Sequence, residues 1–410
     1  MPAGVVSILR RVLTRPERAR TDPHPRPAGR TPHPAAAGTR EAVGIWVGSR
    51  VSLLLFVVLT SWLMNIDAEE RLRSPGQWLL HRLVWRDSFH FLRIADIGYP
   101  RGGQPCCDQA FFPGYPAVIR LFAPLFGGNL MICALVVAEV AGAAATIVLW
   151  HLGTQLTGDP RVGRYAALFL AVAPYGIFLS AAYSESLFLA LTVGAWLAAV
   201  RRRWWLAGVL AGGAAAVRIN GLFLAAALAV MYVMQLREDG RLRPRADAAA
   251  LLVPLAATAA FFGALDMMAG SWNAWGEAEK AGWDRGEAWP WEGLKAGWDL
   301  IHQTQAPHVV FAGWADLLSA VGGIVLVVVL AVRRRWPEAT YVAPNVAVLV
   351  CSTTLLSSSR YALLWFPGYL LVASLARHRA FRWLPWFVVV VCAPLMATLS
   401  LLFAAHAWIG

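Results

Sequence analysis

Long apolar segments are the feature that most restricts how this chain can fold. Five of them have about twenty or more mostly apolar residues, the length that crosses a bilayer as one helix: 43–64, 129–156, 248–269, 309–332 and 383–406. Only 15% of the 410 residues are charged, whereas soluble domains have about a quarter. We therefore predict an all-α fold, that of a polytopic integral membrane protein.

Three further apolar segments are too long for one crossing and carry basic clusters at both ends. They are residues 163–200, 204–236 and 340–376. Because positive residues favour the cytoplasmic side, each segment is predicted to be a hairpin of two short helices. The outward tips are "AAYSES" (181–186), "VRING" (217–221) and "SSSRY" (357–361). Together with the single spans, this gives about eleven crossings, with a cytoplasmic N-terminus.

The predicted domain organisation is a tail followed by one membrane domain. Residues 1–42 are rich in Pro, Arg and small residues, a composition typical of a disordered cytoplasmic tail. Residues 43–410 form a single transmembrane domain, with external loops at about 65–128 and 270–308 that contain amphipathic helices. Within the first loop, residues 111–126 contain three prolines and form either an interfacial or re-entrant piece or the start of the next helix.

The charge and cysteine content exclude some classes of protein. The net charge is +12, but the arginines cluster between apolar segments, which leaves no basic face for nucleic acid. We expect Arg50, near the inner end of the first span, to snorkel towards the cytoplasmic surface. Five cysteines do not form a disulfide framework, and the adjacent Cys106 and Cys107 are expected to be two free thiols.

Ionisable residues in the first external loop indicate a functional site. Residues 86–97 have an apolar face and are predicted to form a helix lying at the outer interface. On this helix Asp87 and His90 are one turn apart, as are Arg93 and Asp96, so each pair is within side-chain reach.

The three predicted tips bring more polar side chains to the same side of the membrane. These are Tyr183, Glu185, Arg218, Asn220, Arg360 and Tyr361. Arginine suits a phosphate through its bidentate fork, and a carboxylate such as Asp87 can deprotonate a hydroxyl within hydrogen-bond reach. We therefore predict a pocket for an anionic, hydroxyl-rich ligand.

Each of these residues also has a structural interpretation. Asp87 could cap its helix, and His90 could be a packed interfacial residue. Glu185 and Arg218 could form a structural ion pair, and Arg360 could snorkel to the headgroups. The six tryptophans of the second external loop form either an aromatic belt or a surface that stacks on a sugar or isoprenoid: Trp272, Trp275, Trp283, Trp289, Trp291 and Trp298.

Four ordered motifs between residues 85 and 225 resemble the PIG-V family of mannosyltransferases, polytopic enzymes of the GT-C class. They are "DSFHFLRIADIGY" (87–99), "AFFPGYP" (110–116), "FLSAAYSESLF" (178–188) and "RINGL" (218–222). One departure is that Arg86 separates Trp85 from Asp87, which are adjacent in the family pattern. The Arg- and Ala-rich, Lys-poor composition is typical of a bacterial member from a GC-rich genome.

The resemblance implies a membrane mannosyltransferase with a GT-C-like fold. It implies transfer from a polyprenyl-phosphate mannose donor to a lipid or envelope glycoconjugate acceptor, on the external side of the plasma membrane. By the same resemblance Asp87 is the catalytic base, while Glu185, Arg218 and Arg360 hold substrate or donor phosphate. Its partners would be these lipids and the surrounding membrane; no cofactor or metal site is expected, and metal dependence is left open.

Two other functions fit the same residues. A flippase or transporter of a lipid-linked sugar would use the pocket for passage, and another GT-C enzyme would use a different lipid-phosphate sugar. A transporter built from inverted repeats should show two matching halves. The large early loop has no counterpart in a later half, which favours the enzyme.

Overall fold

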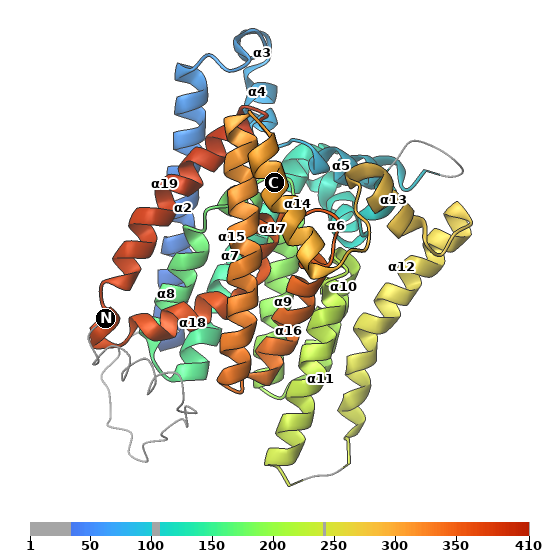
Figure 1. Ribbon diagram of the computed structural model, residues 1–410, viewed down its shortest axis with the longest axis vertical. Coiled ribbons are helices and arrows are strands. Elements are labelled where there is room, and N and C mark those ends of the chain that lie inside the picture. Colours follow the sequence, from blue (N-terminus) through green and yellow to red (C-terminus); the bar gives the residue numbers. More distant parts are fainter. Residues whose placement is uncertain (1–33, 101–106, 241–242, 410) are drawn as a thin grey trace.

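The computed structural model describes residues 34–100, 107–240 and 243–409, and these residues form a helical bundle (Figure 1). No β-strand occurs in these ranges; an isolated bridge joins Glu287 to Ser352. The prediction of an all-α, multi-pass protein is confirmed.

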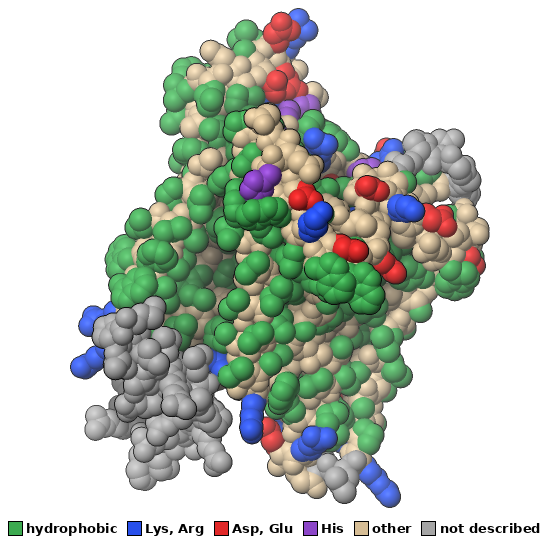
Figure 2. Space-filling view, viewed as in Figure 1, with side chains coloured by type: hydrophobic (Ala, Val, Ile, Leu, Met, Phe, Trp, Pro, Cys, Tyr) green, Lys and Arg blue, Asp and Glu red, His purple; other side chains and the backbone are tan. Residues whose placement is uncertain are grey.

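Long helices occupy all five segments predicted to cross the membrane once. They are α2 (Pro34–Leu63), α7 (Leu130–Thr157), α12 (Val253–Ala269, preceded by η4, Ala246–Leu252), α15 (Pro307–Val332) and α19 (Leu384–Ala404). With α11 (Gly221–Glu238), six helices in the described part of the chain are long and apolar enough to cross a membrane. Figure 2 shows an apolar band between an upper end of mixed charge and a lower end bearing mostly Lys and Arg.

The three predicted hairpins are each broken into two helices. Their members are α8 (Pro160–Ala171) and α9 (Glu185–Val200), α10 (Trp204–Val217) and α11, and α16 (Trp336–Val350) and α18 (Phe366–Ala376). The predicted tip residues lie in the connections or at their edges. The count of eleven crossings stays a prediction, because α8, α9, α10, α16 and α18 are shorter than the roughly 20 residues that span a bilayer.

The predicted disordered tail, residues 1–42, extends too far along the chain. Helix α2 begins at Pro34, so the prediction is wrong for residues 34–42, whereas residues 1–33 lie outside the described part of the chain. The start of α2 is rich in alanine and is tied to the bundle, since Thr39 Oγ1 lies 2.9 Å from His151 Nε2 and Glu41 pairs with Arg164. Helix propensity and these contacts together order it.

Arg50 does not snorkel. It is 3% exposed and its guanidinium is buried between helices, where Nη1 donates to the carbonyl oxygen of Gly176 at 2.7 Å and Nη2 donates to that of Ala171. Ala171 is the last residue of α8, and Gly176 begins the short helix η3 (Gly176–Leu179) in the connection between α8 and α9. Arg50 therefore links the first span to the first hairpin.

The two predicted external loops are folded into short helices at the upper end of the molecule in Figure 1, opposite the lower end of α11. The first loop contains α3 (Ala68–Arg73), α4 (Pro75–His81), α5 (Asp87–Ile97), η1 (Asp108–Ala110), α6 (Gly114–Phe122) and η2 (Ala123–Phe126). The second contains α13 (Ala274–Trp283) and α14 (Pro290–Gln303). The predicted helix after residue 86 is thus present as α5.

The first loop tests two expectations, one on residues 111–126 and one on the thiols of Cys106 and Cys107. Residues 111–126 do not start the next helix, because Gly127 and Gly128 take positive φ values (62° and 81°) and separate η2 from α7. The expectation of free thiols is wrong for Cys107, which is disulfide-bonded. Cys106 lies outside the described residues.

The turn between α10 and α11 closes tightly at Gly221. A Cβ at this position would lie 2.3 Å from both the Cα and the backbone nitrogen of Ala215, closer than real Cβ contacts. Because these are backbone atoms, they cannot move aside as a flexible side chain can. The turn also carries Arg218 and Asn220, so its closure places two of the predicted site residues.

We expect Gly221→Ala to open this turn and to lower the free energy of unfolding by about 1–3 kcal/mol, the usual cost of overpacking. Gly213→Ala in α10 is the matched control, because its new Cβ meets only the Leu191 side chain, at 3.3 Å or more. Thermal denaturation of the two purified variants measures the difference. Equal melting temperatures would contradict the steric explanation.

Candidate functional site

A cavity of about 1010 Å³ lies where the hairpin tips meet the external-loop helices. It is lined by residues from the start of α5, the α10–α11 turn, α13 and the loop after it, α16, α17 (Ser358–Tyr361) and the C-terminal segment. Five predicted site residues line it: Asp87, Arg218, Asn220, Arg360 and Tyr361. The first external loop and two of the hairpin tips therefore supply these residues to one cavity, as the sequence indicated.

Glu185, directly behind the cavity wall, joins the three tips. Its side chain is 1% exposed, and Oε1 accepts hydrogen bonds from Arg218 Nη1 (3.0 Å) and Arg360 Nε (2.5 Å). Glu185 is the first residue of α9, Arg218 follows α10, and Arg360 lies in α17. A charge-assisted bond between buried groups is stronger than a neutral one, so this carboxylate holds two guanidinium groups from different hairpins in place.

Asp87 is held in the cavity wall by the same arginine. Arg360 Nη1 donates to Asp87 Oδ2 at 2.6 Å, and no hydrogen bond to Oδ1 occurs within the described residues. The alternative role as a helix cap does not fit, because the cap position is Arg86 and the Asp87 carboxylate bonds to a guanidinium instead of a backbone N–H. One carboxylate oxygen of Asp87 is therefore left to accept a proton.

Tyr183 supports this arrangement without lining the cavity. Its ring centroid lies 4.5 Å from the Arg360 guanidinium carbon, within the range of a cation–π contact. Its hydroxyl donates to the carbonyl oxygen of Trp85 at 2.9 Å, which ties the first tip to the segment that leads into α5. Tyr183 therefore orients both Arg360 and the start of α5.

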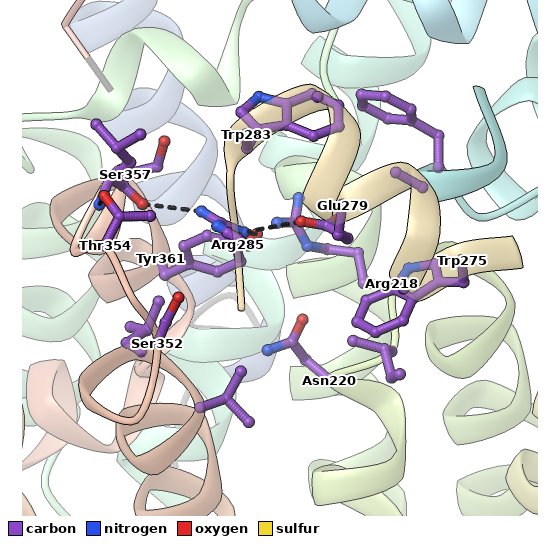
Figure 3. Close-up of a pocket in the computed structure, with 18 of the residues that line it drawn as sticks. Arg218, Asn220, Trp275, Glu279, Trp283, Arg285, Ser352, Thr354, Ser357 and Tyr361 are labelled. Carbon is purple, nitrogen blue, oxygen red and sulfur yellow. Dashed lines mark hydrogen bonds and ion pairs between the residues drawn. The ribbon is translucent and has the colours of Figure 1, made fainter. Parts of the chain in front are cut away.

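The outer wall of the cavity carries a second charged group that sequence reasoning missed. Arg285 Nη1 lies 3.4 Å from Glu279 Oε2 and 3.3 Å from the Tyr361 hydroxyl, and Nη2 donates to the Leu356 carbonyl oxygen at 2.8 Å. Figure 3 shows Glu279 and Arg285 on α13 and its following loop, facing Tyr361 and Arg218. Acids within the tryptophan-rich loop were the available signal.

Charges on both sides of the cavity alter the acidity of two of its residues. Burial raises the pKa of the Tyr361 hydroxyl, but Arg285 and Arg218 outweigh it and hold that pKa below its usual value. Burial also raises the pKa of Glu279; Arg285 opposes this effect, and the nearby charge of Asp87 adds to it. Glu279 is therefore a second carboxylate suited to exchange a proton in the cavity.

A buried acid in α15 positions the short helix α17. Asp316 is 3% exposed; its Oδ1 accepts from the backbone nitrogen (2.8 Å) and the hydroxyl (2.6 Å) of Ser359, and its Oδ2 accepts from the Ser357 nitrogen (3.1 Å). α17 carries Arg360 and Tyr361, so these bonds orient both. Asp316 is an acid inside the predicted span 309–332, and an acid at such a place is expected to have a buried partner. Sequence reasoning missed this signal.

Asn220 links the second hairpin to the third. Its side-chain nitrogen donates to Asn345 Oδ1 at 2.7 Å, and Asn345 in turn donates to the Tyr341 carbonyl oxygen at 2.6 Å. Both asparagines line the cavity, and both are buried. Asn220 is thus as much a connection between helices as a candidate for ligand binding.

Three predicted site residues on α5 are not brought to the cavity. His90 Nδ1 (2.7 Å) and Arg93 Nη2 (2.5 Å) both bind Asp108 Oδ1, and Asp96 is exposed. Burial raises the pKa of the Asp108 carboxyl, but the hydrogen bonds from His90 and Arg93 outweigh it and keep that pKa below its usual value. These residues fasten η1 to α5 within the first loop, and the predicted Asp87–His90 and Arg93–Asp96 pairs do not form.

The tryptophans of the second external loop divide into two groups. Trp275 and Trp283 line the cavity, where they are half-buried. The other four, Trp272, Trp289, Trp291 and Trp298, are exposed, and the rings of Trp289 and Trp291 stack at 5.1 Å. The loop thus presents two indole rings to the cavity and four to its surroundings.

We expect Glu185→Gln to lower the free energy of unfolding by about 3–5 kcal/mol, because it leaves two buried guanidinium groups without their shared charge. Glu69→Gln is the matched control: it breaks an exposed pair with Arg73, of a kind worth about 0–1 kcal/mol. Thermal denaturation in detergent measures both. A Glu185→Gln variant as stable as the control would show that this carboxylate does not hold the tips together.

Comparison with known proteins agrees with the motifs. Residues 68–252 match the family model described as "Mannosyltransferase (PIG-V)". This range contains α5, the start of α9 and the turn between α10 and α11, and therefore Asp87, Glu185 and Arg218. The match does not reach α13, α16 or α17, so Glu279, Arg285 and Arg360 lie outside it.

Several curated proteins are similar to a part of this chain. The "GPI alpha-1,6-mannosyltransferase 2" of Cricetulus griseus is 36% identical over 153 residues, and that of Homo sapiens is 37% identical over 155 residues. Each alignment covers 35% of this chain and 30% of the relative. The "GPI mannosyltransferase 2" of Chaetomium globosum is 30% identical over 202 residues, or 42% of this chain and 43% of the relative. The aligned part therefore spans less than half the length of these relatives.

One solved structure is distantly similar. The Archaeoglobus fulgidus oligosaccharyltransferase aligns with a TM-score of 0.44 and 14% identity, covering 89% of this chain and 53% of that one. This similarity is too low to add to the assignment, so the GT-C-like fold stays a prediction. Residues 68–252, which make up less than half of the chain and contain all four motifs, are similar to the PIG-V family of mannosyltransferases.

Proposed function

We propose that this protein transfers mannose from a polyprenyl-phosphate mannose to a hydroxyl group of a lipid or envelope glycoconjugate, at the non-cytoplasmic side of the plasma membrane. The observation that carries the proposal is Asp87, an ion-paired carboxylate with one free oxygen in the wall of a cavity of about 1010 Å³. The similarity of residues 68–252 to the PIG-V family supports the class of sugar and reaction.

The geometry suits a single displacement at the anomeric carbon. Asp87 Oδ1 takes the proton of the acceptor hydroxyl, whose oxygen then attacks C1 of the mannose. The bond between C1 and the phosphate oxygen breaks, and its electron pair leaves with the polyprenyl phosphate. Arg360 fixes the orientation of the Asp87 carboxylate through Oδ2, so the proton-accepting oxygen faces one direction.

The composition of the cavity wall supports a donor that is polar at one end and apolar along its tail. Arginines and carboxylates gather at the α5, α13 and α17 walls. The α10–α11 turn and α16 add apolar side chains, which are Val217, Ile219, Leu222, Phe223, Val348 and Leu349. A wall of this kind accommodates a sugar phosphate beside an isoprenoid chain.

We expect Asp87→Asn to lower mannosyl transfer by at least about 100-fold, the usual contribution of a positioned base, while the protein still folds. Purified protein in liposomes, radiolabelled polyprenyl-phosphate mannose and a lipid extract as acceptor measure covalent product. Glu279→Gln is the comparison variant, because Glu279 is the other carboxylate that can accept a proton.

The outcome separates three interpretations. Loss of product with Asp87→Asn and retention with Glu279→Gln supports Asp87 as the base, and the reverse result assigns the base to Glu279. If the wild-type protein moves the labelled lipid between leaflets without forming product, it is a flippase and the proposed transfer is wrong.

The proposed sidedness has its own test. Lys295 on α14 and Arg202 between α9 and α10 have exposed side chains at opposite ends of the bundle. We expect a membrane-impermeant maleimide to label a Lys295→Cys variant in intact cells, and to label Arg202→Cys only after the membrane is opened. The opposite pattern would place the cavity on the cytoplasmic side and contradict the proposed use of a donor on the outer face.

A further inference from the structure

The cations that line the cavity differ in whether a carboxylate already neutralises them. Arg218 and Arg360 share Glu185, Arg360 also binds Asp87, and Arg285 lies beside Glu279. Two carboxylates, Asp87 and Glu185, thus balance the two arginines of the hairpin tips. These arginines hold the cavity together, and a ligand could engage them fully only by competing with carboxylates that they already bind.

Arg86 and Lys280 line the same cavity without such a partner. In the described part of the chain, neither side chain forms a hydrogen bond or an ion pair with another residue. Of the two, Arg86 is adjacent in sequence to Asp87, where the proposed reaction takes place. Its guanidinium carbon lies 5.5 Å from the centroid of the Trp85 ring, which in turn stacks on His406 at 4.3 Å.

The backbone at Arg86 is strained. Its φ of 56° and ψ of −114° form a combination that residues other than glycine rarely adopt. Such strain persists only when the surroundings impose it, and it is concentrated at ligand-binding and catalytic positions. A glycine would fit this position without strain, so the presence of arginine indicates that its side chain has a use there.

We propose that Arg86 binds the phosphate of the lipid-linked donor and stabilises it as the leaving group. This inference rests on the proposed function and names a residue that the reaction needs in addition to Asp87. It also reassigns the role expected from the sequence for Arg218 and Arg360, which become positioning residues because Glu185 and Asp87 already bind them.

The chemistry of the step explains why an uncompensated cation is useful. The donor phosphate is a diester with one negative charge, and cleavage of the C1–O bond leaves a monoester with a second charge. A guanidinium placed beforehand stabilises the charge that develops, and its two parallel N–H groups match two phosphate oxygens. The single proton of the step moves from the acceptor hydroxyl to Asp87, and the electron pair of the broken C1–O bond leaves with the phosphate, so charge and atoms balance.

The test uses full-length protein in nanodiscs of zwitterionic lipid and a short-chain polyprenyl phosphate as the probe. The polyprenol of equal chain length and inorganic phosphate are the other two arms, which separate recognition of phosphate from recognition of the chain. Arg86→Gln removes the charge and keeps the strained backbone, whereas Arg86→Gly removes both. Arg120→Gln on α6 is the matched control, because Arg120 is exposed and does not line the cavity.

We expect wild type and Arg120→Gln to bind polyprenyl phosphate alike, and both Arg86 variants to bind it at least about tenfold more weakly, as for loss of a hydrogen bond to a charged group. Polyprenol should bind all four proteins equally, and inorganic phosphate should compete with the probe in wild type. Arg86→Gly should melt at the wild-type temperature or above it, which separates lost binding from lost folding.

The inference is overturned if Arg86→Gln binds the polyprenyl phosphate as wild type does, or if polyprenol binding falls by the same factor. Mannosyl transfer, measured separately on the wild-type protein, tests the proposed function. Absence of transfer together with weakened binding in the Arg86 variants would refute the proposed function and leave the phosphate site standing. Normal transfer together with unchanged binding would refute the phosphate site alone.

Discussion

The cavity depends on one buried carboxylate. Glu185 Oε1 accepts from Arg218 and from Arg360, and so connects residues that are 33 and 175 positions apart along the chain. Removing these charges from water is costly, and the cost is offset only while all of them are paired. Three hairpins whose remaining surfaces are mostly apolar are therefore held in one mutual arrangement by a polar contact at their tips. Apolar packing between helices specifies such an arrangement less sharply.

Further polar contacts extend outward from this centre. Asp316 holds α17 from α15, the Asn220–Asn345 bond joins two hairpins, and Tyr183 ties the first tip to the segment before α5. Each contact links elements that are distant in sequence, and each lies beside or directly behind the cavity. The side chains that shape the cavity are therefore oriented by neighbours and do not depend on a ligand for their positions.

The charged side chains of the cavity fall into two groups: some are paired with each other and hold the structure together, and one is left to bind a ligand. The arginines of the tips are satisfied by Glu185 and Asp87, and Arg285 lies beside Glu279. Arg86 carries a charge without such a partner in the described residues, on a backbone that costs free energy to maintain. The proposed site must attract an anion and later release it. A guanidinium that no carboxylate neutralises suits this role, because it need not break an ion pair before it binds the anion.

The sequence by itself determined the long spans, the three broken hairpins, the helix after residue 86 and the five cavity residues Asp87, Arg218, Asn220, Arg360 and Tyr361. Apolar length, basic flanks and turn positions are local properties, so they can be read without a structure. The tertiary structure decided which acid meets which base. In the folded protein His90 and Arg93 bind Asp108, whereas Asp96 is exposed. Glu279 and Arg285 reach the cavity, and Arg50 is buried. Ion pairs between distant segments depend on how helices pack, and no local pattern in the chain specifies that packing.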